Sequence, residues 1–561
     1  MTQDILAQAR TALEARQLDR ALDLVQAAVR ADPADPDGLE LFATIVQARG
    51  DLRSAEQIWA QAIAMAPDRR GGYNALARLL ASQGRAAETE AVARDAIAAD
   101  PENGFAHAML GIKLSERTML APGIWHLRRA IALGERHPEL LAALGHDLIR
   151  EGDLEEAERA LREAVENMPN GILPRAHLAL ALERQDRFEE ARAMLAETAA
   201  LGAATGQDVT IQEAMLLDRT PDWREGLAML DAVPMLPGTG TLLRGRMRDK
   251  AGRHAEAWRD FVEGKAQLLR EGSQSYAREG VEAHIAQLRQ VFTPERFAAF
   301  PRARRRSDVP QPLFILGFPR SGTTMAEQIL ASHSRIRPGG ELPFTGELIE
   351  FAVTQIGRFP EGLSGLLAAD RHHVVTLFRD FYLARAEQYG LLEPGADWFT
   401  DKMPLNDIYM PLVRLAFPES KIISVRRHPL DVLVSAMSHA LTHGFNCGFR
   451  LEDAAHHLAA ISELTEHWEA IGIPFHRLVY EKFLTGQANE TEALMAFLGM
   501  EVEPAQLKFH ESRRFAATPS YAQVREAVHT KSVERWRNYA AELAPAIPVV
   551  ADAMARDGYT A

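Results

Sequence analysis

The sequence predicts an all-α repeat region followed by an α/β region with a central parallel sheet. One observation is a period of 34 residues in the N-terminal half, where small and turn-forming residues recur at fixed offsets. Another is a change from residue 313 onward, where short apolar runs alternate with helical stretches. The third is length, because 561 residues exceed what one hydrophobic core supports. We expect repeats over residues 1–270, a linking segment over 271–311 and the α/β domain over 312–561.

The repeat is marked by a turn position, a small residue and a proline. The residues that share the turn phase are Arg16, Gly50, Gly84, Thr118, Gly152 and Asp186. The small residues five positions later are Ala21, Ala55, Ala157 and Ala191, and the prolines seventeen positions later are Pro33, Pro67, Pro101 and Pro169. Glycine ends one helix, alanine lets the next helix pack closely, and proline terminates the pair. Gly252 and Ala257 restate the spacing out of phase and indicate a further unit.

This pattern resembles the tetratricopeptide repeat, with four or five units over about residues 1–203. The resemblance implies helix pairs stacked into a superhelix, whose concave face suits extended peptides or partner helices. Two interpretations stay open. The repeats bind an acceptor or a partner, or they serve only as a scaffold for folding or dimerisation.

The predicted strands of the α/β region are Leu313–Leu316, Ser420–Val425 and His476–Val479. Helical stretches separate them, which is typical of a parallel sheet whose ligands bind at the carboxyl ends of the strands. The first strand runs into the loop Gly-Phe-Pro-Arg-Ser-Gly-Thr-Thr at residues 317–324. The region is therefore expected to be P-loop-like, with a ligand at this loop.

The loop fits a phosphate-binding sequence in all but one position. Gly317 and Gly322 have the spacing of G-x-x-x-x-G-K-[ST], but Thr323 stands where the lysine belongs. That lysine normally reaches the β- and γ-phosphates, so its absence disfavours a metal-bound triphosphate and a kinase-like enzyme. The loop can still bind a phosphate at a helix N-terminus. We expect a nucleotide whose single 5′-phosphate carries a substituent, and the alternative is a tight turn with no ligand.

The segment from Pro319 to Glu341 resembles the 5′-phosphosulfate loop of the sulfotransferase superfamily, and most closely that of tyrosylprotein sulfotransferases. The resemblance spans about residues 312–540. It implies 3′-phosphoadenosine-5′-phosphosulfate (PAPS) as the donor and no metal. The residues that it places at the 5′-phosphosulfate are Arg320, Ser321, Gly322, Thr323 and Thr324.

The same resemblance implies the catalytic groups. Glu341 lies 21 residues after Arg320, at the place of the family's catalytic glutamate. A carboxylate is a weak base for a phenol of pKa about 10, so it must be well positioned. Glu347 is the second choice, and His333 also ranks below Glu341. The alternative for Glu341 is a charge at a helix N-terminus or a surface residue. Lys402, in Asp-Lys-Met-Pro-Leu, resembles the lysine that contacts the leaving group, and the alternative is a surface lysine.

Val425–Ser435 resembles the family's 3′-phosphate sequence, R-[DN]-P-x-D-x-x-x-S, with Arg427 and Ser435 as binding residues. His428 and Leu430 depart from that pattern, and Asp431 is expected to cap the helix.

Two later segments complete the resemblance. Tyr480, in Leu-Val-Tyr-Glu-Lys, is expected to contact the adenosine, and core packing is the alternative. Ser520 and Arg535 stand at the donor-contacting places of the segment that closes over the donor.

The charge and composition of the chain argue against several classes of function. A net charge of −14 argues against a nucleic-acid or anionic-membrane binder, and no run of 18 apolar residues predicts a membrane span. The N-terminus has no signal-peptide pattern, and the single cysteine, Cys447, suits a reducing compartment, so we expect a cytoplasmic protein.

Two hypotheses remain for the function. One is a PAPS-dependent sulfotransferase whose acceptor is held by the repeats. That acceptor could be a protein tyrosine, with glycan, lipid and small phenols left open. The other is a non-catalytic repeat adaptor whose C-terminal domain only binds nucleotide. The sequence does not indicate an oligomeric state.

Overall fold

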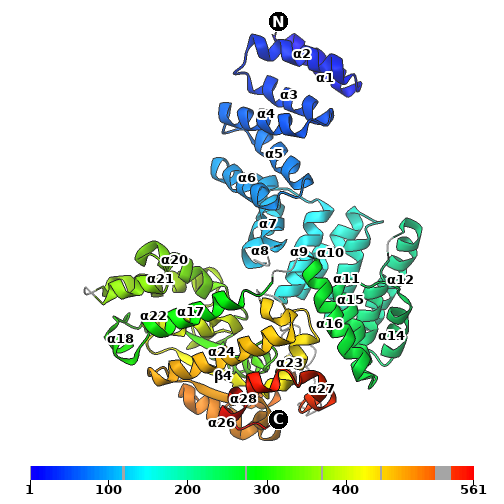
Figure 1. Cartoon of the computed structure of the whole chain (residues 1–561). Helices are drawn as coiled ribbons and strands as arrows, with labels where there is room; N and C mark the ends of the chain where they lie inside the picture. Colours follow the sequence, from blue (N-terminus) through cyan, green and yellow to red (C-terminus); the bar gives the residue numbers. More distant parts are fainter. Residues whose placement is uncertain are drawn as a thin grey trace. The chain divides into compact units, whose positions relative to one another are not determined.

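A computed structural model describes residues 2–116, 120–206, 208–271, 275–367, 371–441, 445–511 and 532–560. The chain forms two compact units, Met1–Leu216 and Leu217–Ala561 (Figure 1). The described part of the first unit is helical, and the second unit combines helices with one five-stranded sheet.

The first unit is a series of helix pairs in which neighbouring helices pack against each other. The pairs are α1 (Thr2–Glu14) with α2 (Leu18–Ala31), α3 (Pro36–Ala48) with α4 (Leu52–Met65), α5 (Arg70–Ser82) with α6 (Ala86–Ala99), α7 (Gly104–Glu116) with α8 (Leu120–Ala132), α9 (Pro138–Glu151) with α10 (Leu154–Asn167), and α11 (Ile172–Arg184) with α12 (Phe188–Thr205). The short helix α13 (Thr210–Asp218) reaches the boundary between the units.

The geometry of these pairs confirms the predicted repeats, although six described pairs stand where four or five units were expected. The turn residues between paired helices have positive φ: Arg16 (54°), Gly50 (87°), Gly84 (72°), Gly152 (94°) and Asp186 (60°). Glycine adopts this left-handed conformation at little cost, which explains its recurrence at the phase position. The alanines five residues later are fully buried: Ala21, Ala55, Ala157 and Ala191. Thr118 lies outside the described residues.

A further helix pair belongs to the second unit. It is formed by α15 (Gly238–Lys250) and α16 (His254–Arg270), preceded by α14 (Trp223–Ala232) and followed by α17 (Arg278–Val291) and α18 (Pro294–Ala299). Gly252 joins α15 to α16 with a φ of 76°, and Ala257 is fully buried, as in the other repeats. The out-of-phase unit predicted from the sequence is therefore present, in the same compact unit as the sheet.

The sheet has five parallel strands in the order β2-β3-β1-β4-β5. The strands are β1 (Gln311–Leu316), β2 (Ile336–Arg337), β3 (Trp398–Asp401), β4 (Lys421–Arg426) and β5 (His476–Val479). The central parallel sheet is confirmed, and β2 and β3 were not predicted. Because all strands run in one direction, the segments that follow β1, β3, β4 and β5 meet at one edge.

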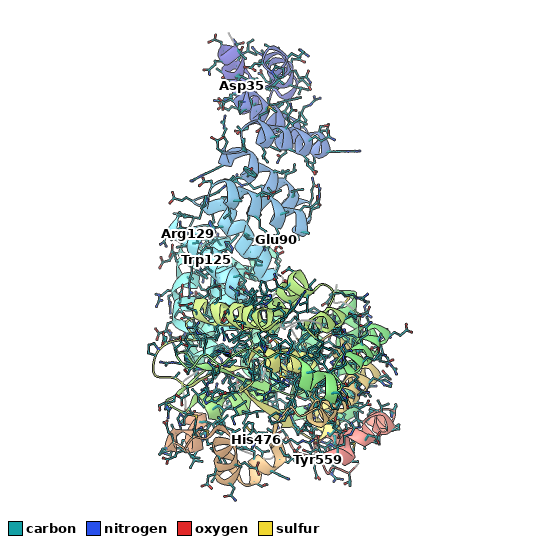
Figure 2. The ribbon with its side chains drawn as sticks, turned by 90° about the vertical axis from the view of Figure 1, so that its left-hand side faces the viewer. Asp35, Glu90, Trp125, Arg129, His476 and Tyr559 are labelled. Carbon is teal, nitrogen blue, oxygen red and sulfur yellow. The ribbon has the colours of Figure 1, made fainter. Side chains whose placement is uncertain are left out.

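The helices of the sheet region connect its strands and follow its last strand. They are α19 (Thr323–Ala331), α20 (Phe344–Ile356), α21 (His372–Gln388), α22 (Met410–Ala416), α23 (Pro429–Met437), α24 (Leu451–Ala470), α25 (Tyr480–Thr485), α26 (Gln487–Leu498), α27 (Ala540–Leu543) and α28 (Ile547–Arg556), with a 3₁₀ turn η6 (Arg535–Tyr539). No helix in the described ranges is long and apolar enough to cross a membrane. In Figure 2, His476 marks the start of β5 and Tyr559 marks the chain just beyond α28.

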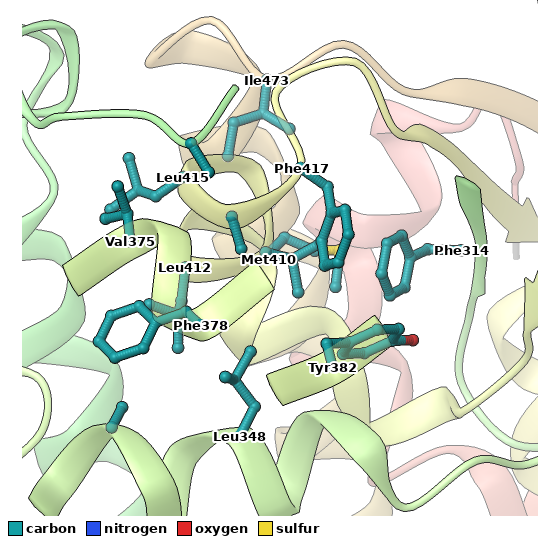
Figure 3. Packing of buried hydrophobic residues seen from close by; sticks show 14 of the residues in the cluster. Phe314, Leu348, Val375, Phe378, Tyr382, Met410, Leu412, Leu415, Phe417 and Ile473 are labelled. Carbon is teal, nitrogen blue, oxygen red and sulfur yellow. The ribbon is translucent and has the colours of Figure 1, made fainter. Parts of the chain in front are cut away.

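The central strand is buried on both faces. Phe314 packs with Tyr382 of α21 and with Phe417, which follows α22 (Figure 3). Alternate residues, Leu313 and Ile315, pack instead with α19 and α26. A strand buried on both faces is fixed in position, so the loop that follows β1 starts from a rigid support.

Candidate active site

The loop between β1 and α19 has a backbone that few residues tolerate. Gly317 and Gly322 have φ values of 145° and 109°, and Arg320 has a φ of 75°. A Cβ on Gly322 would lie 2.7 Å from Cδ2 of Tyr480, too close for any side chain. The hydroxyl oxygen of Ser321 is buried and has no hydrogen-bond partner among the described residues. An unpaired buried hydroxyl beside a helix N-terminus suits an anionic ligand.

The two predicted anion-binding segments meet at this loop. Nε of Arg320 donates to Oγ of Ser435 over 3.0 Å, and one terminal nitrogen of Arg427 donates to the backbone oxygen of Arg320 over 3.0 Å. The Arg427 guanidinium also lies 4.8 Å from the ring centroid of Tyr480, whose ring covers Gly322. Loop, helix α23 and the end of β5 therefore form one positively charged group of residues.

Electrostatics at this group favour an anion. Burial, and after it repulsion from the neighbouring Arg427, Arg246 and Arg535, lowers the pKa of Arg320 to about 9. The pKa of His439 is also held well below its ordinary value, by burial and by the charges of Arg320, Arg246 and Arg535. Buried charges of one sign repel each other, so a bound anion would stabilise this arrangement. Nε of Arg427 is also buried without a partner in the described chain.

The N-terminus of helix α23 is capped by a different residue from the one expected. Asp431 was expected to cap this helix, and that is wrong. The side chain of His428 accepts from the amide of Leu430 over 3.2 Å and is the actual cap. Asp431 instead accepts from the amides of Glu534 and Trp536, both over 2.8 Å. It therefore holds a C-terminal segment beside residues 425–435, the predicted 3′-phosphate sequence.

Glu341 and Lys402 form the second part of the site. Nζ of Lys402 donates to Oε1 of Glu341 over 2.5 Å, and the exposed fractions of the two side chains are 1% and 19%. Glu327 of α19 fixes the surrounding loop, because its Oε1 accepts from the amide of Gly340 over 2.8 Å and from Oγ1 of Thr400 over 2.7 Å. The two predicted catalytic residues thus come together at the carboxyl end of β3.

The second-choice bases have other partners. Glu347 accepts from Nε and a terminal nitrogen of Arg385 over 2.7 and 3.0 Å. His333 lies past the far end of α19 from the phosphate loop, accepts from the amide of Arg335 over 3.1 Å and lies 3.6 Å from Glu503. The hydrogen bonds of these two side chains go to Arg385 and Arg335, whereas Glu341 is bonded to Lys402.

The residues expected to close over the donor are only partly described. Tyr480 lies at the end of β5, with its hydroxyl 3.0 Å from Oγ of Ser532. Arg535 donates to Oδ2 of Asp249 in α15, with distances of 3.0 Å from Nε and 2.9 Å from a terminal nitrogen. Ser520 lies outside the described residues. A donor contact by Arg535 stays a prediction.

Several polar residues around the site escaped the sequence analysis: Arg246, Asp249, Glu327, Thr400 and His439. Glu327 left a weak signal, because it is an acid within the apolar helix that follows the loop. No sequence pattern pointed to Arg246 or Asp249, because they belong to a repeat hairpin and reach the site only through tertiary packing.

A cavity of about 940 Å³ lies elsewhere, at the amino edge of the sheet. Its walls include Pro310, Asp397 and Ser420, which directly precede β1, β3 and β4. It is therefore separate from the edge that carries the loop, Lys402 and Arg427.

Comparisons with known proteins agree with this division of the chain. Residues 312–504 match the model of the sulfotransferase family, and residues 40–104 and 142–208 match that of the tetratricopeptide repeat. The chain therefore carries a sulfotransferase-family domain together with tetratricopeptide repeats, as the sequence resemblances predict.

Individual relatives are distant. A protein of Aquifex aeolicus is 28% identical over 427 residues, which cover 74% of this chain and 55% of that protein, so the chain spans about half of its length. A protein of Caenorhabditis briggsae, provisionally named a protein-tyrosine sulfotransferase, is 24% identical over 41% of this chain and 82% of its own. Among solved structures, YrrB, a tetratricopeptide-repeat protein with an unusual peptide-binding site, is 21% identical over 32% of this chain and 91% of its own, with a TM-score of 0.29.

Proposed function

We propose that the protein is a PAPS-dependent sulfotransferase that transfers a sulfuryl group to an acceptor hydroxyl. The observation that carries this proposal is the meeting of Arg320, Ser435 and Arg427 at the edge of a domain that matches the sulfotransferase family. Two phosphate-binding segments in contact suit a nucleotide phosphorylated at both its 3′ and 5′ positions better than a triphosphate.

The residues fit such a donor. Residues 320–324, which hold the unpaired Ser321 hydroxyl, are assigned to the 5′-phosphosulfate, and Arg427 with Ser435 to the 3′-phosphate. Tyr480, beside the Arg427 guanidinium, is assigned to the adenosine. When bound, PAPS supplies the sulfuryl group that is transferred.

The chain supplies the base and the cations. Glu341 is assigned to accept the proton of the acceptor hydroxyl, which general-base catalysis requires. Arg320 and Lys402 offset the charge that develops on the leaving phosphate. An ammonium has three N–H donors, so Lys402 can keep its bond to Glu341 and still meet an anion. One lysine thus orients the base and places it beside the leaving group.

For the acceptor, we propose a tyrosine of a peptide or protein held by the repeats. Two observations support this class: the spacing from Arg320 to Glu341 and the provisional name of the Caenorhabditis briggsae relative. We further propose a reducing, cytoplasmic location, because the only cysteine, Cys447, is free and buried.

Calorimetric titration tests the donor. We expect adenosine 3′,5′-bisphosphate to bind at least about tenfold more tightly than 5′-AMP, without Mg²⁺, because one charged contact is worth that factor. Arg427→Ala should abolish the preference. Equal affinities, or binding of ATP that requires Mg²⁺, would refute the donor assignment. Transfer of radiolabelled sulfate from PAPS to a tyrosine peptide library tests the reaction, and binding without any transfer would favour the adaptor hypothesis.

A further inference from the structure

The hairpin of α15 and α16 contacts the end of α23, although it lies outside the residues that match the sulfotransferase family. A terminal nitrogen of Arg246 donates to the backbone oxygen of Ser438 over 3.2 Å, and Nζ of the buried Lys265 donates to that of His439 over 2.6 Å. These acceptors directly follow the helical turn of Ser435, which receives the hydrogen bond of Arg320.

Apolar packing holds the hairpin in this place. Leu242 of α15 and Phe261 of α16 belong to one buried cluster with Leu430 and Leu433 of α23. Close packing of this kind fixes the distance between the two elements. Arg246 therefore has a defined position beside the donor site.

Arg246 differs from its neighbours on α15 in what it binds. Arg244 and Arg248 both donate to the carboxylate of Asp260, with distances of 2.8 and 2.9 Å. Within the described part of the chain, no carboxylate lies within ion-pair distance of Arg246, whose hydrogen bond goes to a neutral carbonyl. Burial lowers the pKa of Arg246, the more distant Asp218 raises it in part, and Arg535 lowers it by a smaller amount. Arg246 is thus a partly buried cation near others of its sign.

Arg246 and Arg320 reach the same short segment from two sides. Arg320 donates to Ser435 and also lies 3.5 Å from Nε2 of His439, while Arg246 contacts Ser438 between them. Together with Arg427, these arginines give the site three guanidinium groups, and each can meet a phosphate oxygen with paired N–H donors.

We propose that Arg246 binds a phosphate of the bisphosphorylated adenosine nucleotide, so that the last repeat hairpin supplies part of the donor site. This inference rests on the proposed function, because it assumes that a nucleotide with two phosphate groups occupies the carboxyl edge of the sheet. It goes beyond that function by assigning a donor contact to a residue of the repeats.

The test compares Arg246→Gln with Arg259→Gln, which removes an exposed arginine of the same hairpin. Affinity for adenosine 3′,5′-bisphosphate is measured by calorimetry at two salt concentrations, and the melting temperature of the free protein is measured in parallel. We expect Arg246→Gln to weaken binding at least about tenfold and to reduce its salt dependence. Its melting temperature should equal or exceed that of the wild type, because the repulsion of Arg246 with Arg320 and Arg535 is removed. Arg259→Gln should match the wild type in affinity.

The outcomes separate the inference from the proposed function. If the wild type binds the bisphosphate and Arg246→Gln binds it equally well, the inference alone is wrong. A melting temperature of Arg246→Gln well below that of the wild type assigns a structural role to the arginine and overturns the inference whatever the affinity. If the wild type does not bind the bisphosphate, the proposed function is wrong and the inference is wrong with it.

Discussion

Lys402 and Glu341 lie 61 residues apart in the sequence and are joined by a hydrogen bond of 2.5 Å from Nζ to Oε1. The lysine side chain is only 1% exposed, so it has little access to water as a substitute partner. Each charged side chain therefore depends on the other for its neutralisation. A change in the proposed base should alter the proposed leaving-group cation as well.

Glu341→Gln should separate chemistry from binding. The substitution keeps the shape of the side chain and removes the proton acceptor, and general-base catalysis is worth about 10²–10⁴-fold. We expect kcat on a verified acceptor to fall by roughly that factor, while the affinity for adenosine 3′,5′-bisphosphate stays within a few-fold. Near-normal turnover would place the base elsewhere, and Glu347 and His333 would then be the next candidates.

The ion pair between Lys402 and Glu341 should also contribute to the free energy of unfolding. Glu341→Ala leaves a buried ammonium without its carboxylate, which we expect to cost up to about 3 kcal/mol. Adding Lys402→Met removes the stranded charge and should restore much of the loss. Chemical denaturation of the two variants and the wild type measures this. A double variant less stable than Glu341→Ala would contradict the dependence of one charge on the other.

Gly322→Ala should damage the phosphate loop. The alanine would need a φ of 109° and would place its Cβ 2.7 Å from the Tyr480 ring, which we expect to cost about 1–3 kcal/mol and to weaken bisphosphate binding. Gly346→Ala is the matched control, because Gly346 lies within α20 with nothing within 4 Å of the added Cβ. It should gain about 0.5–1 kcal/mol and leave binding unchanged. Equal effects of the two substitutions would show that the loop geometry is unimportant.

Truncation should show which helices the proposed donor site needs. A chain that starts at Arg219 keeps α14 to α16 and should fold and bind adenosine 3′,5′-bisphosphate. A chain that starts at Ser275 loses the hairpin and exposes the apolar cluster around Leu430, so we expect it to aggregate or to lose binding. Gel filtration and calorimetry distinguish the two. Intact binding by the shorter chain would mean that the hairpin is not needed for nucleotide binding by the sulfotransferase-family domain.

His457 should contribute to acid sensitivity. Burial lowers the pKa of His457 to about 4, and its Nδ1 lies 3.0 Å from the hydroxyl of Tyr276. Between pH 6.5 and pH 5 the unfolded histidine takes up a proton that the folded one refuses, so the folded state should lose about 2 kcal/mol as the pH falls. His457→Gln should reduce this loss, and His456→Gln, at the partly exposed neighbour, should not. Identical pH profiles for both variants would contradict the assignment.

Local patterns in the sequence predicted the repeats, the central sheet and the members of the site that follow a strand. Gly322 could be predicted from the glycine spacing of phosphate-binding loops, and Arg427 from its resemblance to the family's 3′-phosphate sequence. The partner of Arg535 could not, because Asp249 lies 286 residues away and meets it only after the hairpin packs on the domain. The role of Asp431 was misjudged for a similar reason. A helix-start position suggests a cap, and only the folded chain brings the amides of Glu534 and Trp536 to it.

The left-handed backbone of Arg320 implies a conflict between folding and ligand binding at one residue. A φ of 75° costs a side-chain-bearing residue roughly 1–2 kcal/mol that glycine would avoid, and the guanidinium adds repulsion from its neighbours. Its hydrogen bond to Ser435 offsets only part of this cost. The residue proposed to bind an anion therefore lowers the stability of the fold when no anion is bound. Substitutions there that raise thermal stability should be easy to find, and they should come at the expense of activity.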